Sequence, residues 1–196
     1  LHYIENDQKL ENGSLILIDA GSEWNYYSAD ITRTWPVNGK FTNEQKDIYE
    51  IVLEANTKAI EECKIGNTIN SPHIKALNIL IEGLKNLKIL NESIDEIIEK
   101  NLYFPFYMHS TSHWLGLDVH DSGKYKDRKD NFTKFEEGMI LTIEPGLYFG
   151  DMAQKVSKNY KNIGIRIEDD ILITKSGPKN LSKKIPKNIK DLEKPY

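Results

Sequence analysis

Residues 163–168 read Ile-Gly-Ile-Arg-Ile-Glu, an apolar strand pattern in which charged side chains take every second position near its end. Side chains alternate between the two faces of a β-strand, so Arg166 and Glu168 share one face while the isoleucines point to the other. The segment is therefore predicted to be a strand with one face in the core and an acid and a base on the other.

Carboxylates interrupt four apolar segments of this kind. They are Asp19 after residues 15–18, Asp30 before Ile31, Glu144 after residues 140–143, and Glu168. An ionised carboxylate inside a protein is strongly destabilising unless it is paired or coordinates a cation. Four separate buried salt bridges are one explanation, but Arg33 and Arg166 are too few to match four acids.

A pair of divalent metal ions explains this excess of acid better. Four carboxylates carry too much negative charge for one ion and suit two ions that share bridging carboxylates. Oxygen-rich ligation with one imidazole favours Mn²⁺, with Co²⁺, Zn²⁺ or Fe²⁺ as alternatives. Two such ions hold and deprotonate a bridging water, so the chemistry indicated is hydrolysis.

The imidazole is expected from residues 108–121, Met-His-Ser-Thr-Ser-His-Trp-Leu-Gly-Leu-Asp-Val-His-Asp, which contain His109, His113 and His120. Each of these histidines taken alone is more often structural than a ligand. Their clustering among glycine and small residues favours a site. His73 stands on a Lys-flanked predicted helix and is expected to be structural.

The rest of the pattern alternates between strands and helices. Strands are predicted at residues 15–19, 26–37, 139–149 and 163–174. A helix is predicted over residues 43–63 after a capping box of Thr42 and Gln45, a second from Ser71-Pro72, and a third, shorter one capped by Ser93. This order favours an α+β fold in which a mostly antiparallel sheet carries helices on one face.

Composition bounds the class of protein. The chain has 196 residues with 26 basic and 30 acidic side chains, a net charge of -4, and one cysteine, Cys63. No apolar run reaches the ~18 residues that a membrane span requires, so no membrane association is expected. A single cysteine provides no disulfide framework, which favours a cytoplasmic protein.

Basic charge gathers at the C-terminus. Residues 175–196 hold seven lysines against Asp191 and Glu193, with no arginine and only Tyr196 as an aromatic residue. Segments that bind single-stranded nucleic acid combine basic charge with stacking aromatics, so a solvated tail is favoured over binding to nucleic acid or lipid headgroups. We therefore expect a Lys-rich tail at residues 183–196.

Five segments in order resemble the Xaa-Pro aminopeptidases (aminopeptidase P), within the proline-peptidase and methionine-aminopeptidase group of dinuclear metallohydrolases. The segments are residues 17–21 (Leu-Ile-Asp-Ala-Gly), 29–34 (Ala-Asp-Ile-Thr-Arg-Thr), 109–121, 142–148 (Thr-Ile-Glu-Pro-Gly-Leu-Tyr) and 164–170 (Gly-Ile-Arg-Ile-Glu-Asp-Asp). The resemblance implies the pita-bread (creatinase/aminopeptidase) fold, a largely antiparallel curved sheet with helices on its outer face. Residues 1–182 would then be the catalytic metallopeptidase domain.

Family members carry an N-terminal domain and the opening part of the catalytic domain before the position that matches Leu1. We therefore expect that the N-terminal part of the fold is missing from this chain. A second departure from the family pattern is Ser110 and Thr111, where glycine and an aliphatic residue are usual.

By motif position, the resemblance makes Asp19, Asp30, His113, Glu144 and Glu168 the metal ligands. It implies that Asp30 and Glu168 bridge both ions, that Asp19 serves one ion, and that His113 and Glu144 complete the other. Glu144 is also expected to move the proton between the bridging water and the leaving amine.

The resemblance assigns further residues to the substrate pocket. His2, His109 and His120 match pocket histidines, and His2 and His120 are expected to help stabilise the tetrahedral intermediate. Arg166 is expected to orient neighbouring acids through charge-assisted hydrogen bonds, and Tyr148 follows the Glu144 strand into the site.

The activity implied is hydrolysis of the bond between an N-terminal residue and a following proline by a metal-bridging hydroxide. The substrates would be peptides with proline at the second position, and the full-length protein would be a homo-oligomer. A prolidase, which has the same ligands and cleaves Xaa-Pro dipeptides, is the nearest alternative, although residues 30–35 and 113–116 lean toward the aminopeptidase. A non-catalytic pita-bread binding protein is disfavoured because all five ligands are present.

Overall fold

An antiparallel pair of strands positions the first two predicted acids, Asp19 on one strand and Asp30 directly before the other. The computed structural model describes residues 3–153 and 156–193. In it, β1 (Leu15–Ala20) pairs with β4 (Ile31–Pro36), so that Asp19 lies opposite Thr32. The aliphatic and β-branched residues of both segments suit a pleated, half-buried surface, as the sequence predicts.

A small hairpin lies between these two strands. β2 (Glu23–Trp24) and β3 (Tyr27–Ser28) are joined by Asn25 and Tyr26, whose φ angles of 50° and 70° suit a type I′ turn. The strand predicted at residues 26–37 is therefore divided. At the base of the hairpin a Cβ on Gly21 would lie 1.6 Å from the carbonyl oxygen of Ala29, so only glycine allows the chain to close here.

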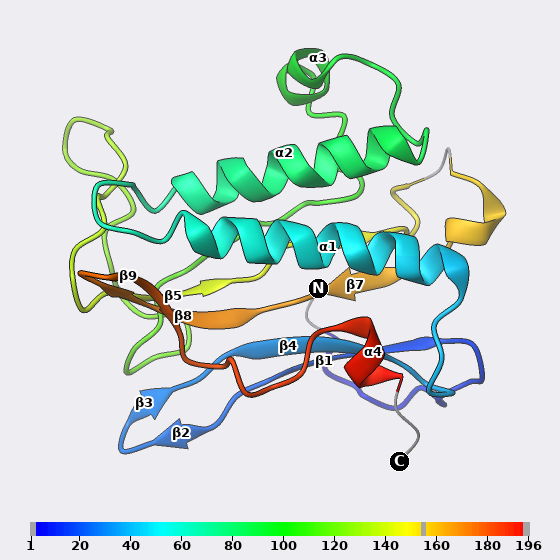
Figure 1. Ribbon diagram of the computed structural model, residues 1–196, viewed down its shortest axis with the longest axis horizontal. Helices are drawn as coiled ribbons and strands as arrows, with labels where there is room; N and C mark the ends of the chain where they lie inside the picture. The colour runs from blue at the N-terminus through cyan, green and yellow to red at the C-terminus, as the bar shows by residue number, and fades with distance from the viewer. Residues whose placement is uncertain (1–2, 154–155, 194–196) are drawn as a thin grey trace.

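Two long helices lie along one side of the strands (Figure 1). α1 (Asn43–Glu61) begins with the predicted capping box, in which Thr42 and Gln45 each accept a hydrogen bond from the backbone N–H of the other. α2 (Ser71–Asn86) has Pro72 in its first turn as predicted, but its N-cap is Asn70 and not Ser71. α3 (Ile94–Glu99) follows the predicted cap Ser93.

The remaining strands form a three-stranded set and a two-stranded set. β5 (Ile140–Ile143) pairs with β8 (Asp169–Thr174), which also pairs with β9 (Gly177–Asn180). β6 (Gly146–Tyr148) pairs with β7 (Gly164–Arg166), and the 3₁₀ turn η1 (Lys158–Tyr160) lies between them in sequence. All of these pairs are antiparallel, and Ile143 of β5, Ile165 of β7, and Ile171 and Ile173 of β8 are buried in one core with α1 and α2. The α+β prediction is confirmed.

The C-terminal segment packs against the body of the protein. Leu192, in the short helix α4 (Ile189–Leu192), is 3% exposed, and the hydroxyl of Tyr49 on α1 donates to the carbonyl oxygen of Lys187 at 3.0 Å. In the described part of the expected Lys-rich tail, residues 183–193, Lys183, Lys184 and Lys190 are exposed while Leu192 and the backbone of Lys187 contact the body. Net charge does not reveal that this segment supplies an apolar side chain and backbone acceptors to buried partners.

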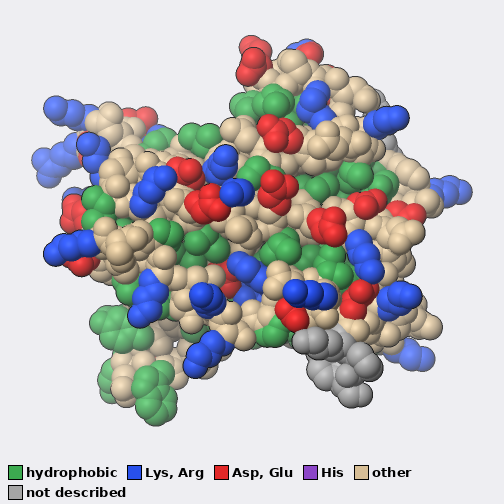
Figure 2. All heavy atoms as spheres, viewed as in Figure 1, with side chains coloured by type: hydrophobic (Ala, Val, Ile, Leu, Met, Phe, Trp, Pro, Cys, Tyr) green, Lys and Arg blue, Asp and Glu red, His purple; other side chains and the backbone are tan. Residues whose placement is uncertain are grey.

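The face formed by the helices is a mixed charged surface. Figure 2 shows acidic and basic side chains interspersed over it, with no described histidine in view. Apolar side chains gather where the β2–β3 hairpin projects, and Trp24, Tyr26 and Tyr27 there are well exposed. Within residues 3–153 and 156–193, no helix is long and apolar enough to cross a membrane.

Candidate metal centre

The five predicted ligands converge on one cleft. Three sets of side chains have ligand atoms within 4.8 Å of one another: Asp19, Asp30 and Glu168; His113, Glu144 and Glu168; and Asp30, His113 and His120. All of them line a cleft of about 270 Å³. The first two sets share Glu168, and Asp30 belongs to both the first and the third. Such sharing is the arrangement required for two neighbouring ions with bridging carboxylates.

Each acid stands at the end of a strand or at a break between strands. Asp19 is near the end of β1, Asp30 directly precedes β4, Glu144 lies between β5 and β6, and Glu168 lies between β7 and β8. His113 comes from the loop beside β5, where its carbonyl oxygen accepts a hydrogen bond from the N–H of Thr142 at 3.0 Å. The sheet therefore fixes the backbone on which each of these side chains is mounted.

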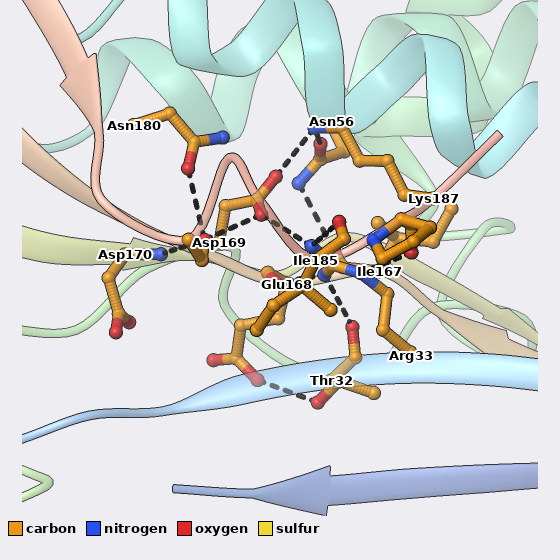
Figure 3. A network of polar contacts seen from close by, with 12 residues as sticks. Thr32, Arg33, Asn56, Ile167, Glu168, Asp169, Asp170, Asn180, Ile185 and Lys187 are labelled. Atoms are coloured by element: carbon orange, nitrogen blue, oxygen red, sulfur yellow. Dashed lines mark hydrogen bonds and ion pairs between the residues drawn. The ribbon is translucent and has the colours of Figure 1, made fainter.

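Thr32 and Arg166 connect the acids of the cleft. Thr32 lies two residues after Asp30, and its hydroxyl donates to Glu168 Oε2 at 2.6 Å (Figure 3). The same hydroxyl accepts a hydrogen bond from Arg166 Nε at 3.1 Å, while Arg166 Nη2 donates to Asp19 Oδ2 at 2.6 Å. Arg166 thus lies where the sequence predicts, against the acids that it is expected to orient.

His113 is oriented to use one ring nitrogen as a ligand. Its Nδ1 lies 3.0 Å from the carbonyl oxygen of Trp114, which can accept only from a protonated Nδ1. Nε2 is then the nitrogen available to a metal ion, and it lies 3.2 Å from Asp30 Oδ2 and 3.5 Å from Glu144 Oε1, with which a protonated ring pairs. Metal-ligating histidines are held in this way by a hydrogen bond on the other nitrogen.

The acids of the cleft are short of positive charge. Burial, together with the charges of Glu144 and Asp30, raises the pKa of Glu168 well above its ordinary value. Burial also raises the pKa of Glu144 to about 7, and it raises that of Asp19, which shares a hydrogen bond with Asp30. Burial alone would raise the pKa of Asp30, but its hydrogen bond with His113 holds it below the ordinary value. Added cationic charge would therefore stabilise this cluster.

The other predicted pocket residues surround the ligands. His109 Nε2 lies 2.8 Å from the hydroxyl of Tyr148, and burial lowers the pKa of His109 to about 4, so its ring is neutral. The exposed ring of His120 packs edge-on against that of His113 with 4.3 Å between ring centroids. Tyr148 also accepts a hydrogen bond from Arg166 Nη1 at 3.1 Å. His2 lies outside the described residues.

Sequence reasoning missed several residues that support the site. Thr32 could have been found, because it shares a strand face with Asp30. No sequence signal indicates the two contacts of Thr111. Its hydroxyl is hydrogen-bonded to Nδ1 of His73 on α2 at 2.9 Å, and its carbonyl oxygen accepts a hydrogen bond from the N–H of Glu144 at 2.8 Å. From outside the cleft, His73 therefore supports the loop that carries His113 and pairs with the backbone of Glu144.

The donor set fits a pair of hard or borderline divalent ions. It offers eight carboxylate oxygens from Asp19, Asp30, Glu144 and Glu168, and one imidazole nitrogen from His113. Ions that prefer thiolate ligands are a poor match, because Cys63 is buried away from the cleft at the end of α1. The chemistry of the donors thus agrees with the ions expected from the sequence.

Comparisons with known proteins agree with this geometry. Residues 1–175 match the model of metallopeptidase family M24. The chain is 49% identical over 193 residues to a Xaa-Pro aminopeptidase of Haemophilus influenzae and 47% identical to one of Escherichia coli, in each case over 98% of this chain. It spans about 44% of the length of these curated relatives.

Solved structures give the same result. The structure of Pseudomonas aeruginosa aminopeptidase PepP superposes with a TM-score of 0.95 at 44% identity, and Escherichia coli aminopeptidase P with the inhibitor Pro-Leu superposes with a TM-score of 0.93 at 47% identity. Each comparison covers 98% of this chain and 43% of the other. The predicted pita-bread fold is confirmed by these superpositions.

Proposed function

Because this chain belongs to metallopeptidase family M24, we propose that it carries the active site of a Xaa-Pro aminopeptidase, a hydrolase that removes an N-terminal residue preceding proline. The names of its relatives at 47–49% identity support this activity. The observation that carries the proposal is the convergence of Asp19, Asp30, His113, Glu144 and Glu168 on one cleft.

In this proposal the cleft holds two divalent ions, most simply Mn²⁺, with Co²⁺, Zn²⁺ or Fe²⁺ as alternatives. Asp19 would hold one ion, His113 and Glu144 would hold the other, and Asp30 and Glu168 would contribute to both, which is consistent with the shared ligand sets. When bound, the ions would polarise the scissile carbonyl group and supply a nucleophilic hydroxide.

The protein side chains supply proton transfer and orientation. Glu144 takes the proton of the attacking water and returns it to the leaving proline nitrogen, and its Oε2 lies 3.7 Å from His109 Nδ1 in the same cleft. His120, and His2 by its sequence position, donate to the developing oxyanion. Arg166 holds Asp19 and the Tyr148 hydroxyl in place.

Two alternatives use the same fold. A prolidase would have the same ligands and act on Xaa-Pro dipeptides, and a non-catalytic pita-bread protein would bind a partner in the cleft. The relatives at 47–49% identity, which are Xaa-Pro aminopeptidases by name, favour the aminopeptidase over both. A cytoplasmic location and a homo-oligomeric full-length protein complete the proposal, and the single buried Cys63 is compatible with a reducing compartment.

The test is substrate length. We would incubate the purified protein with Mn²⁺ and either an Xaa-Pro dipeptide or an Xaa-Pro-Yaa tripeptide of the same first residue. Release of the first residue from the tripeptide is expected. Cleavage of the dipeptide alone would identify a prolidase, and cleavage of neither with two bound ions would favour the non-catalytic protein.

A further inference from the structure

The strands that carry the metal ligands have a second polar face (Figure 3). Side chains alternate along extended backbone, so Arg33 points away from Thr32, and Asp169 points away from Glu168. The side chains of Arg33 and Asp169 pair at 2.8 Å, and each is 2% exposed or less. A buried ion pair therefore lies directly behind the acids of the cleft.

The C-terminal segment adds a second cation to this pair. Lys187 Nζ lies 2.5 Å from Asp169 Oδ2 and 2.6 Å from Oδ1 of Asn56 on α1. The hydroxyl of Ser182 donates to Asp169 Oδ1 at 2.6 Å. Both oxygens of Asp169 thus have partners, and two cations surround one carboxylate. The buried negative charge of Asp169 is therefore neutralised by side chains of the protein itself.

The network ends on the peptide groups next to two metal ligands. Asn56 Nδ2 donates to the carbonyl oxygen of Ile143 at 2.9 Å and to that of Ile167 at 3.2 Å. These two residues directly precede Glu144 and Glu168. One fully buried amide therefore connects the break between β5 and β6 to the break between β7 and β8.

Arg33 holds the other side of Glu168. Its Nη1 donates to the carbonyl oxygen of Glu168 at 2.5 Å and to that of Thr32 at 2.9 Å. The peptide carbonyls before and after the Glu168 side chain are thus both fixed by side chains of the network. A rotation of either peptide would move the Glu168 carboxylate.

We propose that Arg33, Asn56, Asp169 and Lys187 are positioning residues that set the separation of Glu144 from Glu168. The inference rests on the proposed two-ion function. Glu144 and Glu168 belong with His113 to one ligand set, whereas Asp19 and Asp30 belong with Glu168 to the other. Removal of the Asn56 amide should therefore weaken the ion bound by His113, Glu144 and Glu168 more than the other ion.

The principal test is Asn56→Asp, which keeps the volume and the acceptor for Lys187 but replaces the Nδ2 donor by an acceptor. Asn86→Asp, at an exposed position in the last turn of α2, makes the same chemical change away from the network. Metal-free proteins are titrated calorimetrically with Mn²⁺. Loss of a residue that orients a ligand typically lowers metal affinity 10–100-fold, so we expect one of two Mn²⁺ affinities to fall at least about tenfold in Asn56→Asp and neither to change in Asn86→Asp.

Lys187→Met is a milder variant in which Asn56 keeps its donors but loses the cation on Oδ1. Lys190→Met, at an exposed position three residues along the same segment, is its control. We expect a smaller loss of the same Mn²⁺ affinity in Lys187→Met. Electron paramagnetic resonance at two equivalents of Mn²⁺ gives a readout independent of turnover, because exchange coupling between the ions should weaken in both network variants. If the loss of activity in these variants comes from an incompletely filled metal site, excess Mn²⁺ should restore their kcat.

The outcomes separate the two claims. A wild-type protein that binds two ions while Asn56→Asp binds both with unchanged affinity would overturn the positioning role and leave the proposed function intact. A wild-type protein that binds fewer than two ions would overturn the two-ion function and this inference with it. If Asn56→Asp does not fold by circular dichroism, Lys187→Met decides, and an unchanged isotherm there would refute the inference.

Discussion

Glu168 and Asp169 are adjacent in sequence, nearly equally buried and opposite in their electrostatics. Burial and neighbouring acids raise the pKa of Glu168 well above its ordinary value. Burial also pushes the pKa of Asp169 upward, but Lys187 and Arg33 outweigh it and hold that pKa below the ordinary value. Two consecutive residues thus place, on opposite faces of the chain, a charge that the protein balances and a charge that it leaves unbalanced.

The difference shows which buried acids indicate a metal site. A buried acid that side-chain cations neutralise is structural, whereas a group of acids without enough cations is suited to bind metal. Arg33, which the sequence analysis set against the four cleft acids, is paired with Asp169 behind them. Of Arg33 and Arg166, only Arg166 forms an ion pair with the carboxylate of a predicted ligand, that of Asp19. The deficit of positive charge in the cleft is therefore larger than the sequence count indicates.

The largest expected effect is a loss of turnover when an acid of the cleft, where the charges are unbalanced, is removed. Glu144→Ala removes both a ligand and the group proposed to transfer the proton, and general acid–base groups contribute about 10²–10⁴-fold to rate. We expect kcat for an Xaa-Pro-Yaa peptide to fall by at least that range. Glu136→Ala, at an exposed position shortly before β5, should leave kcat unchanged. Near wild-type turnover by Glu144→Ala would refute the assignment.

The next effect compares the two faces directly in the metal-free protein. Asp169→Asn leaves the buried Arg33 and the half-buried Lys187 without their carboxylate, and breaking a buried pair costs about 3–5 kcal/mol. Glu168→Gln removes an unbalanced charge and should leave the free energy of unfolding unchanged or increased. Urea unfolding of both variants measures this. Equal destabilisation by the two substitutions would contradict the contrast between the faces.

The smallest effect concerns the hydroxyl that joins the acids of the cleft. Thr32→Val keeps the shape but removes the partner of Glu168 Oε2 and Arg166 Nε, and an unsatisfied buried polar group costs about 1–3 kcal/mol. The free energy of unfolding should fall by that amount, less than in Asp169→Asn. Thr57→Val, exposed on α1, is the control. Equal unfolding free energies for Thr32→Val and Thr57→Val would show that the hydroxyl has no such role.

The sequence predicts the residues of the cleft better than the distant residues that hold them in place. Local patterns indicate the ligand strands, the capping box of α1 and the short helix after Ser93, because each depends on residues close together in the chain. The packing of the C-terminal segment depends on partners far away in sequence, and α4 is only four residues long, too short for a periodic signal. The pairing of Asp169 with Arg33 and Lys187 is equally non-local. Strand alternation predicts that Asp169 faces away from Glu168, but it does not predict that these two cations neutralise its charge.

The central claim is that the unbalanced acids form a site for two ions. The most direct test is to remove metal with a chelator, dialyse the protein against Mn²⁺ and then against metal-free buffer, and count the bound ions by inductively coupled plasma mass spectrometry. We predict two Mn²⁺ per wild-type chain and fewer than two for Glu168→Gln, because Glu168 belongs to both ligand sets. One ion or none in the wild type, or two ions retained by Glu168→Gln, would contradict the account.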